Sequence, residues 1–384
     1  MRKRNAVRAA AAALAATMVL TACGGGGGNE TTAAAGGDTG STAAGGDAAT
    51  SGSGEVGKTD ITFAMGADIV TLDPAGQQDT TTSVIIKHVY STLLDISDEG
   101  ELVPDLAESY ELVNDTDFVF KLREDAVWSD GTPVTANDVK FTFDRAKNMP
   151  KTKSNTSKVK EVVVDNEHQV TIKLTEPYAP FKSIVANSNL SIVQEAAVTA
   201  AGEAYGDADN AVGSGPFTVK EWVPNDHYTL EKNANYWGEE PITTSITCRV
   251  IPEGSARAIA LETGEVDLVW NVDPTDCSNI EANSDVKLLS QPSSSIEYLG
   301  MNVTKEHFKD QKVRQAINYA IDKQALVDTI VEGRGTVANS YINNTIPGWT
   351  DEVEAYPYDP EKAKELMAEA GYPDGFSCQL WVNG

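Results

Sequence analysis

The sequence has little positive charge and lacks the clustered basic residues that bind nucleic acid. Its 384 residues include 30 Lys and Arg against 57 Asp and Glu, a formal net charge of -27 at pH 7. Basic residues do not cluster after residue 10, whereas a phosphate backbone is held mainly by grouped Lys and Arg. The composition therefore argues against a sequence-independent nucleic-acid binder. Its length and 41% hydrophobic content predict two or three folded domains.

Histidine and catalytic motifs are also scarce. His88, His168, His227 and His307 are scattered, without an H-E-x-x-H motif or paired cysteines, so a zinc hydrolase or structural zinc has little support. The G-x-S-x-G elbow of serine hydrolases is missing. We therefore expect no catalytic residue, metal or other cofactor, and an exported hydrolase is the least favoured function.

The first residues have the pattern of a bacterial export signal. Four basic residues lie within the first eight positions, and residues 9–20 form an apolar stretch too short for a permanent membrane span. Leu20-Thr21-Ala22-Cys23 resembles the lipobox, in which a diacylglycerol is attached to the cysteine and the chain is cut before it. We expect residues 1–22 to be a signal peptide and Cys23 to be lipidated; an ordinary signal with an incidental cysteine is the alternative.

Residues 23–58 read as a flexible linker behind the lipidated cysteine. Residues 24–57 hold 13 of the 31 glycines and no aromatic side chain, so they cannot form a core. Residues 52–59 match the phosphate loop G-x-x-x-x-G-K-[ST], but a low-complexity stretch precedes them and a strand-like run follows. Nucleotide binding is not expected there. Without residues 1–22, 26 basic and 57 acidic residues remain, a net charge of -31.

From residue 59 onward, short β-branched runs alternate with helical patterns, which predicts a mixed α/β architecture. One helix is expected over 313–331 from its apolar stripe, and another over 360–370 with Asp359 as N-cap and Gly371 as C-cap. Thr135 is expected to cap a helix that starts at Ala136, with Asp138 at its third position. Strands are predicted at 62–65, 118–122, 162–164, 170–174, 217–222 and 228–232.

Four segments carry a family resemblance. They are 107–139, which contains FKLREDAVWSDGTPVTANDV, 213–217 with 231–237, 313–322, and 359–375. Together they resemble the family 5 extracellular solute-binding proteins, the peptide and nickel receptors of ABC importers. The resemblance implies an α/β, two-lobed periplasmic-binding-protein-like fold of type II, with an extra subdomain in the first lobe. The implied boundaries are 59–93 and 191–292 for lobe I, 94–190 for the inserted subdomain, and 293–384 for an incomplete lobe II.

The resemblance also implies where a ligand binds. The loop after Leu72-Asp73-Pro74 matches the part of relatives that reaches the cleft, the strand Val266–Trp270 ends in an aromatic-polar pair, and the strand Ser293–Leu299 crosses between lobes. The implied ligand-binding residues are Gln77, Gln78, Asp79, Trp270, Asn271, Ser294 and Tyr298. Core packing is the alternative for Trp270, and a turn is the alternative for Asn271.

The remaining cysteines and the end of the chain give two further expectations. Export permits one disulfide, and Cys248 with Cys277 is the favoured pair because both lie in one predicted lobe, which leaves Cys378 unpaired. A strand is predicted over Ser377–Val382, and the remainder of lobe II in relatives has no counterpart here. A fragment or truncated gene product is therefore expected.

The function implied is that of a lipid-anchored, monomeric receptor that is not an enzyme. It would capture oligopeptides or dipeptides on the outer face of the cytoplasmic membrane and deliver them to an ABC permease. The alternatives are a receptor for a nickel chelate, haem or another solute, and a peptide-sensing surface lipoprotein.

Overall fold

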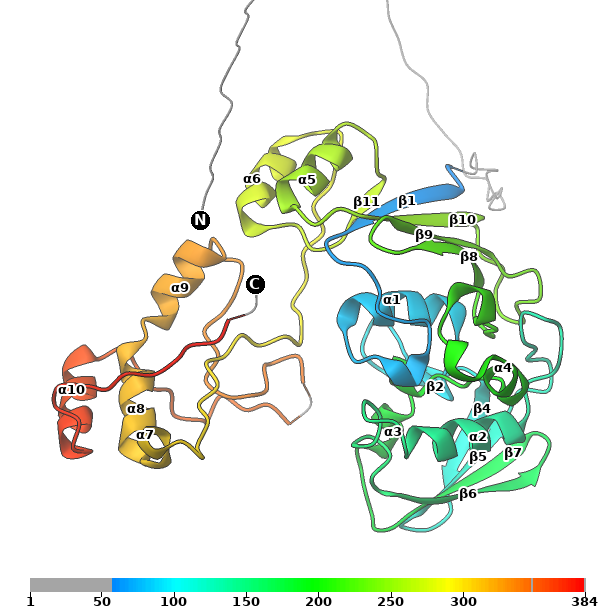
Figure 1. Cartoon of the computed structure of the whole chain (residues 1–384), viewed down its shortest axis with the longest axis horizontal. Helices are drawn as coiled ribbons and strands as arrows, with labels where there is room; N and C mark the ends of the chain where they lie inside the picture. Colours follow the sequence, from blue (N-terminus) through cyan, green and yellow to red (C-terminus); the bar gives the residue numbers. More distant parts are fainter. Residues whose placement is uncertain (1–56, 347, 383–384) are drawn as a thin grey trace, which may run out of the picture. The chain divides into compact units, whose positions relative to one another are not determined.

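The computed structural model describes residues 57–346 and 348–382 (Figure 1). The predicted signal peptide, Cys23 and nearly all of the predicted linker lie outside the described residues. None of the helices that the structure describes is long and apolar enough to cross a membrane.

A five-stranded mixed sheet has the order β11-β1-β10-β9-β8. Strand β1 runs parallel to both β10 and β11, whereas β9 is antiparallel to β10 and to β8. The carboxyl ends of β1, β10 and β11 therefore lie at one edge of the sheet. The strands are β1 Asp60–Met65, β8 Phe217–Val223, β9 His227–Lys232, β10 Ser245–Val250 and β11 Leu268–Val269.

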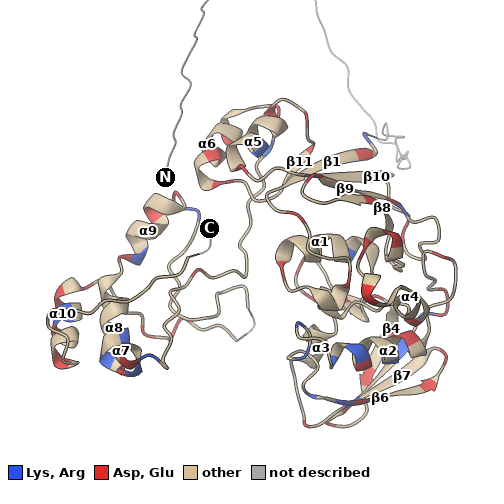
Figure 2. Cartoon of the chain, in the orientation of Figure 1, with Lys and Arg blue, Asp and Glu red and all other residues tan. Residues whose placement is uncertain are grey.

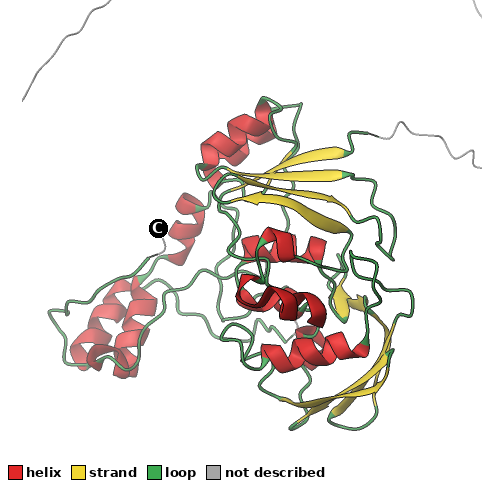
Figure 3. Ribbon diagram, turned by 45° about the vertical axis from the view of Figure 1, so that its right-hand side comes forward, coloured by secondary structure: helices red, strands yellow, loops and turns green. Residues whose placement is uncertain are grey.

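A second, antiparallel sheet has the order β4-β5-β7-β6. Every second residue of β5 and β7 is buried, as expected for strands with one face on a core. Helix α2, Ala136–Ala146, covers that face (Figure 3), and Phe143 of α2 is fully buried in one core cluster with Phe120 and Trp128. The strands are β4 Ala107–Leu112, β5 Asp117–Leu122, β6 Val159–Asn166 and β7 Gln169–Leu174.

Shorter elements lie before, between and after the strands of the two sheets. A hairpin of β2 and β3 precedes β4, and helices α5 and α6 follow β10 and β11. Their bounds are β2 Leu94–Ile96, β3 Leu102–Pro104, α1 Thr80–Val89, α3 Phe181–Ile184, α4 Glu195–Ala201, α5 Gly254–Glu262 and α6 Pro274–Ala282.

Residues 293–382 contain four helices and, among the described residues, no strand. Helices α8 and α10 pack together through Ala316, Ala363 and Leu366. The strands predicted at Ser293–Leu299 and Ser377–Val382 are wrong, because an extended segment forms a strand only when a neighbouring backbone pairs with it, and no described segment does. The helices are α7 Glu306–Lys309, α8 Gln311–Ala320, α9 Lys323–Ile330 and α10 Pro360–Glu369.

The single helix predicted over 313–331 is also wrong, because the chain breaks between α8 and α9. Ile321 is extended, with φ -95° and ψ 117°, and the Asp322 carboxylate accepts a hydrogen bond from the Ala325 amide at 2.9 Å. Asp322 thus caps a new helix.

The other predicted elements are confirmed. Asp359 caps α10 by accepting from the Lys362 amide at 2.9 Å. The predicted C-cap is one residue off: α10 ends at Glu369 with Ala370 as its C-cap, and Gly371, with φ +87°, follows because it takes the left-handed conformation that turns the chain away. Asp138 accepts from the Thr135 amide at 3.0 Å at the start of α2. All six predicted strands lie within β1, β5, β6, β7, β8 and β9.

The predicted disulfide is wrong, because Cys248 and Cys277 are free thiols. Cys248 packs on β10 within the cluster that contains Met65 and Tyr228, and burial raises the pKa of its thiol to about 11. The Cys277 thiol lies on α6, where it donates to the Asp273 carbonyl at 3.5 Å. The two thiols thus lie in different parts of the fold and do not pair. Cys378 is exposed and unpaired.

Charged side chains of both signs are interspersed on the described surface (Figure 2). Several pair locally along helices, such as Lys140 with Asp144 at 2.6 Å on α2 and Lys309 with Glu306 at 2.8 Å on α7. These pairs are exposed and contribute little to stability.

Candidate ligand-binding site

The loop that follows β1 is held in place by a buried ion pair. The Asp73 carboxylate accepts from Arg145 of α2 through Nη1 at 2.8 Å and Nη2 at 2.6 Å. The same carboxylate caps the short helical turn Pro74–Gly76 by accepting from the Ala75 amide at 3.1 Å. Gln77 therefore follows a turn that is anchored to α2 through Asp73 and Arg145.

The next three residues are the predicted ligand residues Gln77, Gln78 and Asp79. Gln77 is only 1% exposed; its side-chain oxygen accepts from the Ser83 hydroxyl at 3.2 Å, whereas Nε2 has no hydrogen-bond partner in the described chain. The Gln78 side-chain amide donates to the Lys151 carbonyl. Asp79 caps α1 by accepting from the Thr82 amide at 2.7 Å. A buried carboxamide with an unused nitrogen is costly and marks this loop as a candidate site.

Two surface hollows open on this loop, and both are lined by Gln77, Gln78 and Asp79. The larger has a volume of about 570 Å³ and the smaller about 440 Å³. Carboxamides and hydroxyls dominate the lining of the smaller hollow. The larger is completed by Val70, Thr71, Gly76 and Lys151, and the smaller by Thr80, Ser83, Asn155, Asn187 and Asn189.

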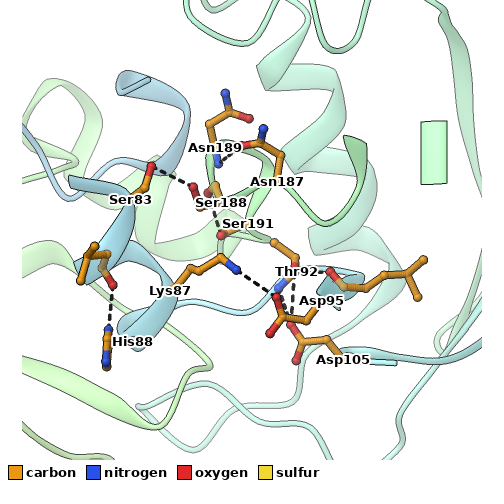
Figure 4. Close-up of polar contacts among 12 residues, drawn as sticks. Ser83, Lys87, His88, Thr92, Asp95, Asp105, Asn187, Ser188, Asn189 and Ser191 are labelled. Carbon is orange, nitrogen blue, oxygen red and sulfur yellow. Dashed lines mark hydrogen bonds and ion pairs between the residues drawn. The ribbon is translucent and has the colours of Figure 1, made fainter. Parts of the chain in front are cut away.

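The wall opposite α1 is built from a short polar segment. The Asn187 side chain accepts from the Asn189 amide at 3.1 Å, the Ser188 hydroxyl donates to the Ser83 hydroxyl at 3.1 Å, and the Ser191 hydroxyl donates to the Ser188 carbonyl at 2.8 Å (Figure 4). The Asn155 amide donates to the Asn189 side chain at 3.1 Å. These bonds fix the amide groups that face the hollow.

Sequence reasoning missed this wall. Asn155, Asn187 and Asn189 belong to no motif, and they meet Gln77 only through tertiary folding. One available signal is the run of uncharged polar residues 187–189 beside an otherwise apolar, buried segment.

The structure places Trp270 and Asn271 directly after β11, which is shorter than the predicted strand Val266–Trp270. Trp270 is 40% exposed, so it is not a core residue, and its amide donates to the Ala64 carbonyl of β1 at 3.0 Å. Asn271 has a φ of 57°, the left-handed conformation of a turn residue. Because β1 and β11 are parallel neighbours, the segments that follow them leave the same sheet edge. Neither residue lines the two hollows.

Ser294 and Tyr298 lie in an extended segment away from any described strand. Tyr298 is 70% exposed, and its ring lies 5.9 Å from that of Tyr341. Neither residue lines the two hollows that Gln77, Gln78 and Asp79 share. The structure therefore brings three of the seven predicted residues into one cavity system.

Two carboxylates, Asp95 and Asp105, lie near Lys87 of α1 (Figure 4). The Asp105 carboxylate accepts from the Thr92 amide at 2.7 Å, and burial raises the pKa of Asp105 to about 7. Lys87 pairs with Asp95 at 3.1 Å nearby. Among the described residues, no group of three or more His, Cys, Asp and Glu side chains is placed to hold a metal ion.

Comparisons with known proteins support a single family. A family model for bacterial extracellular solute-binding proteins, family 5 Middle, matches residues 101–383. The glutathione-binding protein GsiB of Shigella dysenteriae is 34% identical over 327 residues, which cover 84% of this chain and 63% of the relative. The chain thus spans less than two thirds of the length of this curated relative.

Two solved structures have a similar fold. DppA from Helicobacter pylori in complex with the peptide STSA has a TM-score of 0.76 and 28% identity, covering 82% of this chain and 66% of that chain. NikZ from Campylobacter jejuni in complex with Ni(L-His) has a TM-score of 0.71 and 25% identity, covering 82% and 63%. The predicted α/β periplasmic-binding-protein fold is confirmed by these matches, and the chain belongs to the bacterial extracellular solute-binding proteins of family 5.

Proposed function

We propose that this chain is the solute receptor of an ABC importer and that it captures oligopeptides or dipeptides for delivery to the permease. The observation that carries the proposal is the rigid Gln77–Asp79 loop, which lines both hollows. The structure of DppA with a bound peptide and the glutathione-binding relative GsiB support a peptide ligand.

The chemistry of the smaller hollow suits a peptide. Side-chain carboxamides of Gln77, Asn155, Asn187 and Asn189 each carry donors and an acceptor, so they can match the alternating N–H and C=O groups of a peptide backbone. Asp79 is occupied in capping α1, which leaves it poorly placed for acid-base catalysis. Capture without turnover is therefore the role that this lining favours.

The proposed receptor has the following organisation. Residues 1–22 are the signal peptide, lipidated Cys23 begins the linker 23–58, and the lipid holds the monomeric receptor on the outer face of the cytoplasmic membrane. Lobe I comprises 59–93 and 191–292, the inserted subdomain 94–190, and 293–384 belong to lobe II. Trp270, Asn271, Ser294 and Tyr298 contact the ligand when the lobes close.

The proposal is tested by ligand-observed NMR on the full chain, with the peptide Ser-Thr-Ser-Ala and with glutathione as probes. We expect at least one probe to bind, and Gln77→Ala to weaken binding about fivefold, because a buried hydrogen bond to ligand contributes on the order of 1 kcal/mol. Gln169→Ala, on β7, is the matched control and should bind as the unchanged chain does. Failure of both peptides to bind would overturn the peptide proposal.

A receptor for a metal chelate is the second candidate, because the similar structure NikZ holds Ni(L-His). The described residues offer no cluster of metal ligands, so such a chelate would be held through its organic part. Binding of the nickel-histidine chelate, without binding of either peptide in the same assay, would favour this candidate.

A further inference from the structure

Arg257 is a buried cation at the sheet edge where β1, β10 and β11 end. It lies in α5 and is only 5% exposed. Its carboxylate partner, Asp273, is 3.5 Å away and has a side chain that is 53% exposed. Burial of a guanidinium is unfavourable unless hydrogen bonds from the protein replace those it makes with water. The groups that accept from Arg257 therefore indicate its role.

Those contacts reach the chain after two separate strands. Nη1 donates to the carbonyls of Ile251 at 2.9 Å and Pro252 at 2.8 Å, directly after β10. Nη2 donates to the carbonyl of Asn271 at 3.1 Å, directly after β11. One planar guanidinium therefore joins two loops that are 20 residues apart in the sequence.

The guanidinium also contacts the chain after the strand between them. Gly66 follows β1, and a Cβ atom at this position would lie 2.9 Å from Nη1 of Arg257. A side chain at this position would therefore require the guanidinium to move. In the sheet, β1 lies between β10 and β11. Arg257 therefore lies against the segments that follow three adjacent parallel strands.

Asn271, whose carbonyl accepts from Arg257, adopts the left-handed conformation, with φ 57°. This conformation is uncommon for a residue other than glycine and persists where surrounding contacts favour it. It also turns the chain immediately after Trp270, whose side chain is left 40% exposed. Arg257 therefore fixes the backbone on which Trp270 is presented.

We propose that Arg257 is a positioning residue, which clamps the segments after β1, β10 and β11 and thereby places Trp270 and Asn271 for ligand binding. The placement of Trp270 and Asn271 for ligand rests on the proposed function. The contacts of Arg257 with the three segments do not depend on it. Among the described residues, Arg257 makes no hydrogen bond to a predicted ligand side chain, and it acts through the Asn271 backbone.

The clamp is tested by amide hydrogen exchange on the full chain without ligand. In Arg257→Met, we expect the amides of residues 270–273 to exchange at least tenfold faster, while those of β9 keep their rates. The control is Arg249→Met, which removes an exposed arginine of β10 paired with Glu265 at 3.4 Å. Unchanged exchange at 270–273, or equal acceleration throughout the chain, would overturn the clamp. If Arg257→Met fails to fold, Arg257→Lys takes its place.

The link to ligand is tested by a double-mutant cycle with the peptide or chelate that binds the unchanged chain. Arg257→Lys should weaken binding about tenfold, and this loss should disappear when Trp270→Ala is already present, because the arginine acts through that loop. Losses that simply multiply would refute the positioning role. If no probe binds the unchanged chain, the proposed function fails, whereas hydrogen exchange still decides whether the clamp exists.

Discussion

Asp73 and Arg145 form a two-point ion pair that joins the loop after β1 to helix α2, 72 residues further along the chain. Their side chains are 8% and 20% exposed, and the Arg145 guanidinium lies 5.4 Å from the centre of the Tyr205 ring. The pair links the five-stranded sheet's β1 loop to the helix that covers the four-stranded sheet. The ion pair therefore fixes the position of the turn from which the chain continues into Gln77.

Replacing Asp73 by Asn should therefore destabilise the protein. The change leaves the Arg145 charge largely buried without its partner, which costs about 3 kcal/mol in comparable pairs. Urea unfolding followed by circular dichroism measures the loss. Asp144→Asn is the matched control, because its pair with Lys140 is exposed and should contribute less than about 1 kcal/mol. Equal effects of the two substitutions would contradict the structural role of the Asp73 pair.

Asp105 should make stability fall as the pH rises. Burial raises its pKa in the folded protein from 3.8 to about 7, so between these values the folded state holds a proton that the unfolded state has lost. The contribution of Asp105 to stability therefore decreases as the pH rises from about 4 to about 7, and it is constant outside that range. The charged groups around it are Asp95 and Lys87, and Tyr236 also interacts with it.

The measurement is the free energy of unfolding of the unchanged chain and of Asp105→Asn at pH 5 and pH 8. From pH 5 to pH 8, the free energy of unfolding of Asp105→Asn should rise by on the order of 2 kcal/mol relative to that of the unchanged chain. Asp98→Asn, an exposed carboxylate of the nearby hairpin, should show no such change. A pH-independent difference between the unchanged chain and Asp105→Asn would contradict the burial of a titrating carboxyl.

The cysteines should differ sharply in reactivity. Cys378 is exposed, whereas Cys248 is buried and its thiol pKa is raised to about 11; a thiolate is the reactive form. Iodoacetamide at pH 8 should therefore label Cys378 in the folded protein and label Cys248 only after denaturation. Mass mapping without reductant should also find Cys248 and Cys277 separately alkylatable once unfolded. A peptide that links the two would contradict the structure.

The fold was predictable where local pattern and tertiary partner agree. Alternation in 118–122 and 170–174 marks β5 and β7 because each strand has a core on one face. The family resemblance implied a strand at 293–299, yet these residues have no backbone partner among the described residues. Sequence records the tendency to be extended, whereas pairing depends on the rest of the chain.

The candidate site was predictable only in part for a similar reason. Gln77, Gln78 and Asp79 follow a recognisable Leu-Asp-Pro segment, whereas Asn155, Asn187 and Asn189 come from positions that no local pattern singles out. Arg257 was missed because its role lies in carbonyl contacts after β10 and β11, and backbone contacts leave no side-chain motif.

The start of α9 should depend on Asp322. Its carboxylate accepts from the Ala325 amide at 2.9 Å, and loss of such a cap costs about 1 kcal/mol. Asp322→Ala should therefore speed amide exchange at the start of α9 several-fold and leave α8 unchanged, because Asp310 caps α8 separately through the Lys312 amide at 2.8 Å. Asp328→Ala, inside α9, is the control that keeps the cap. If Asp322→Ala instead slowed exchange across 320–325, the two helices would have merged, and the apolar stripe over 313–331 would favour one continuous helix whenever the cap is absent.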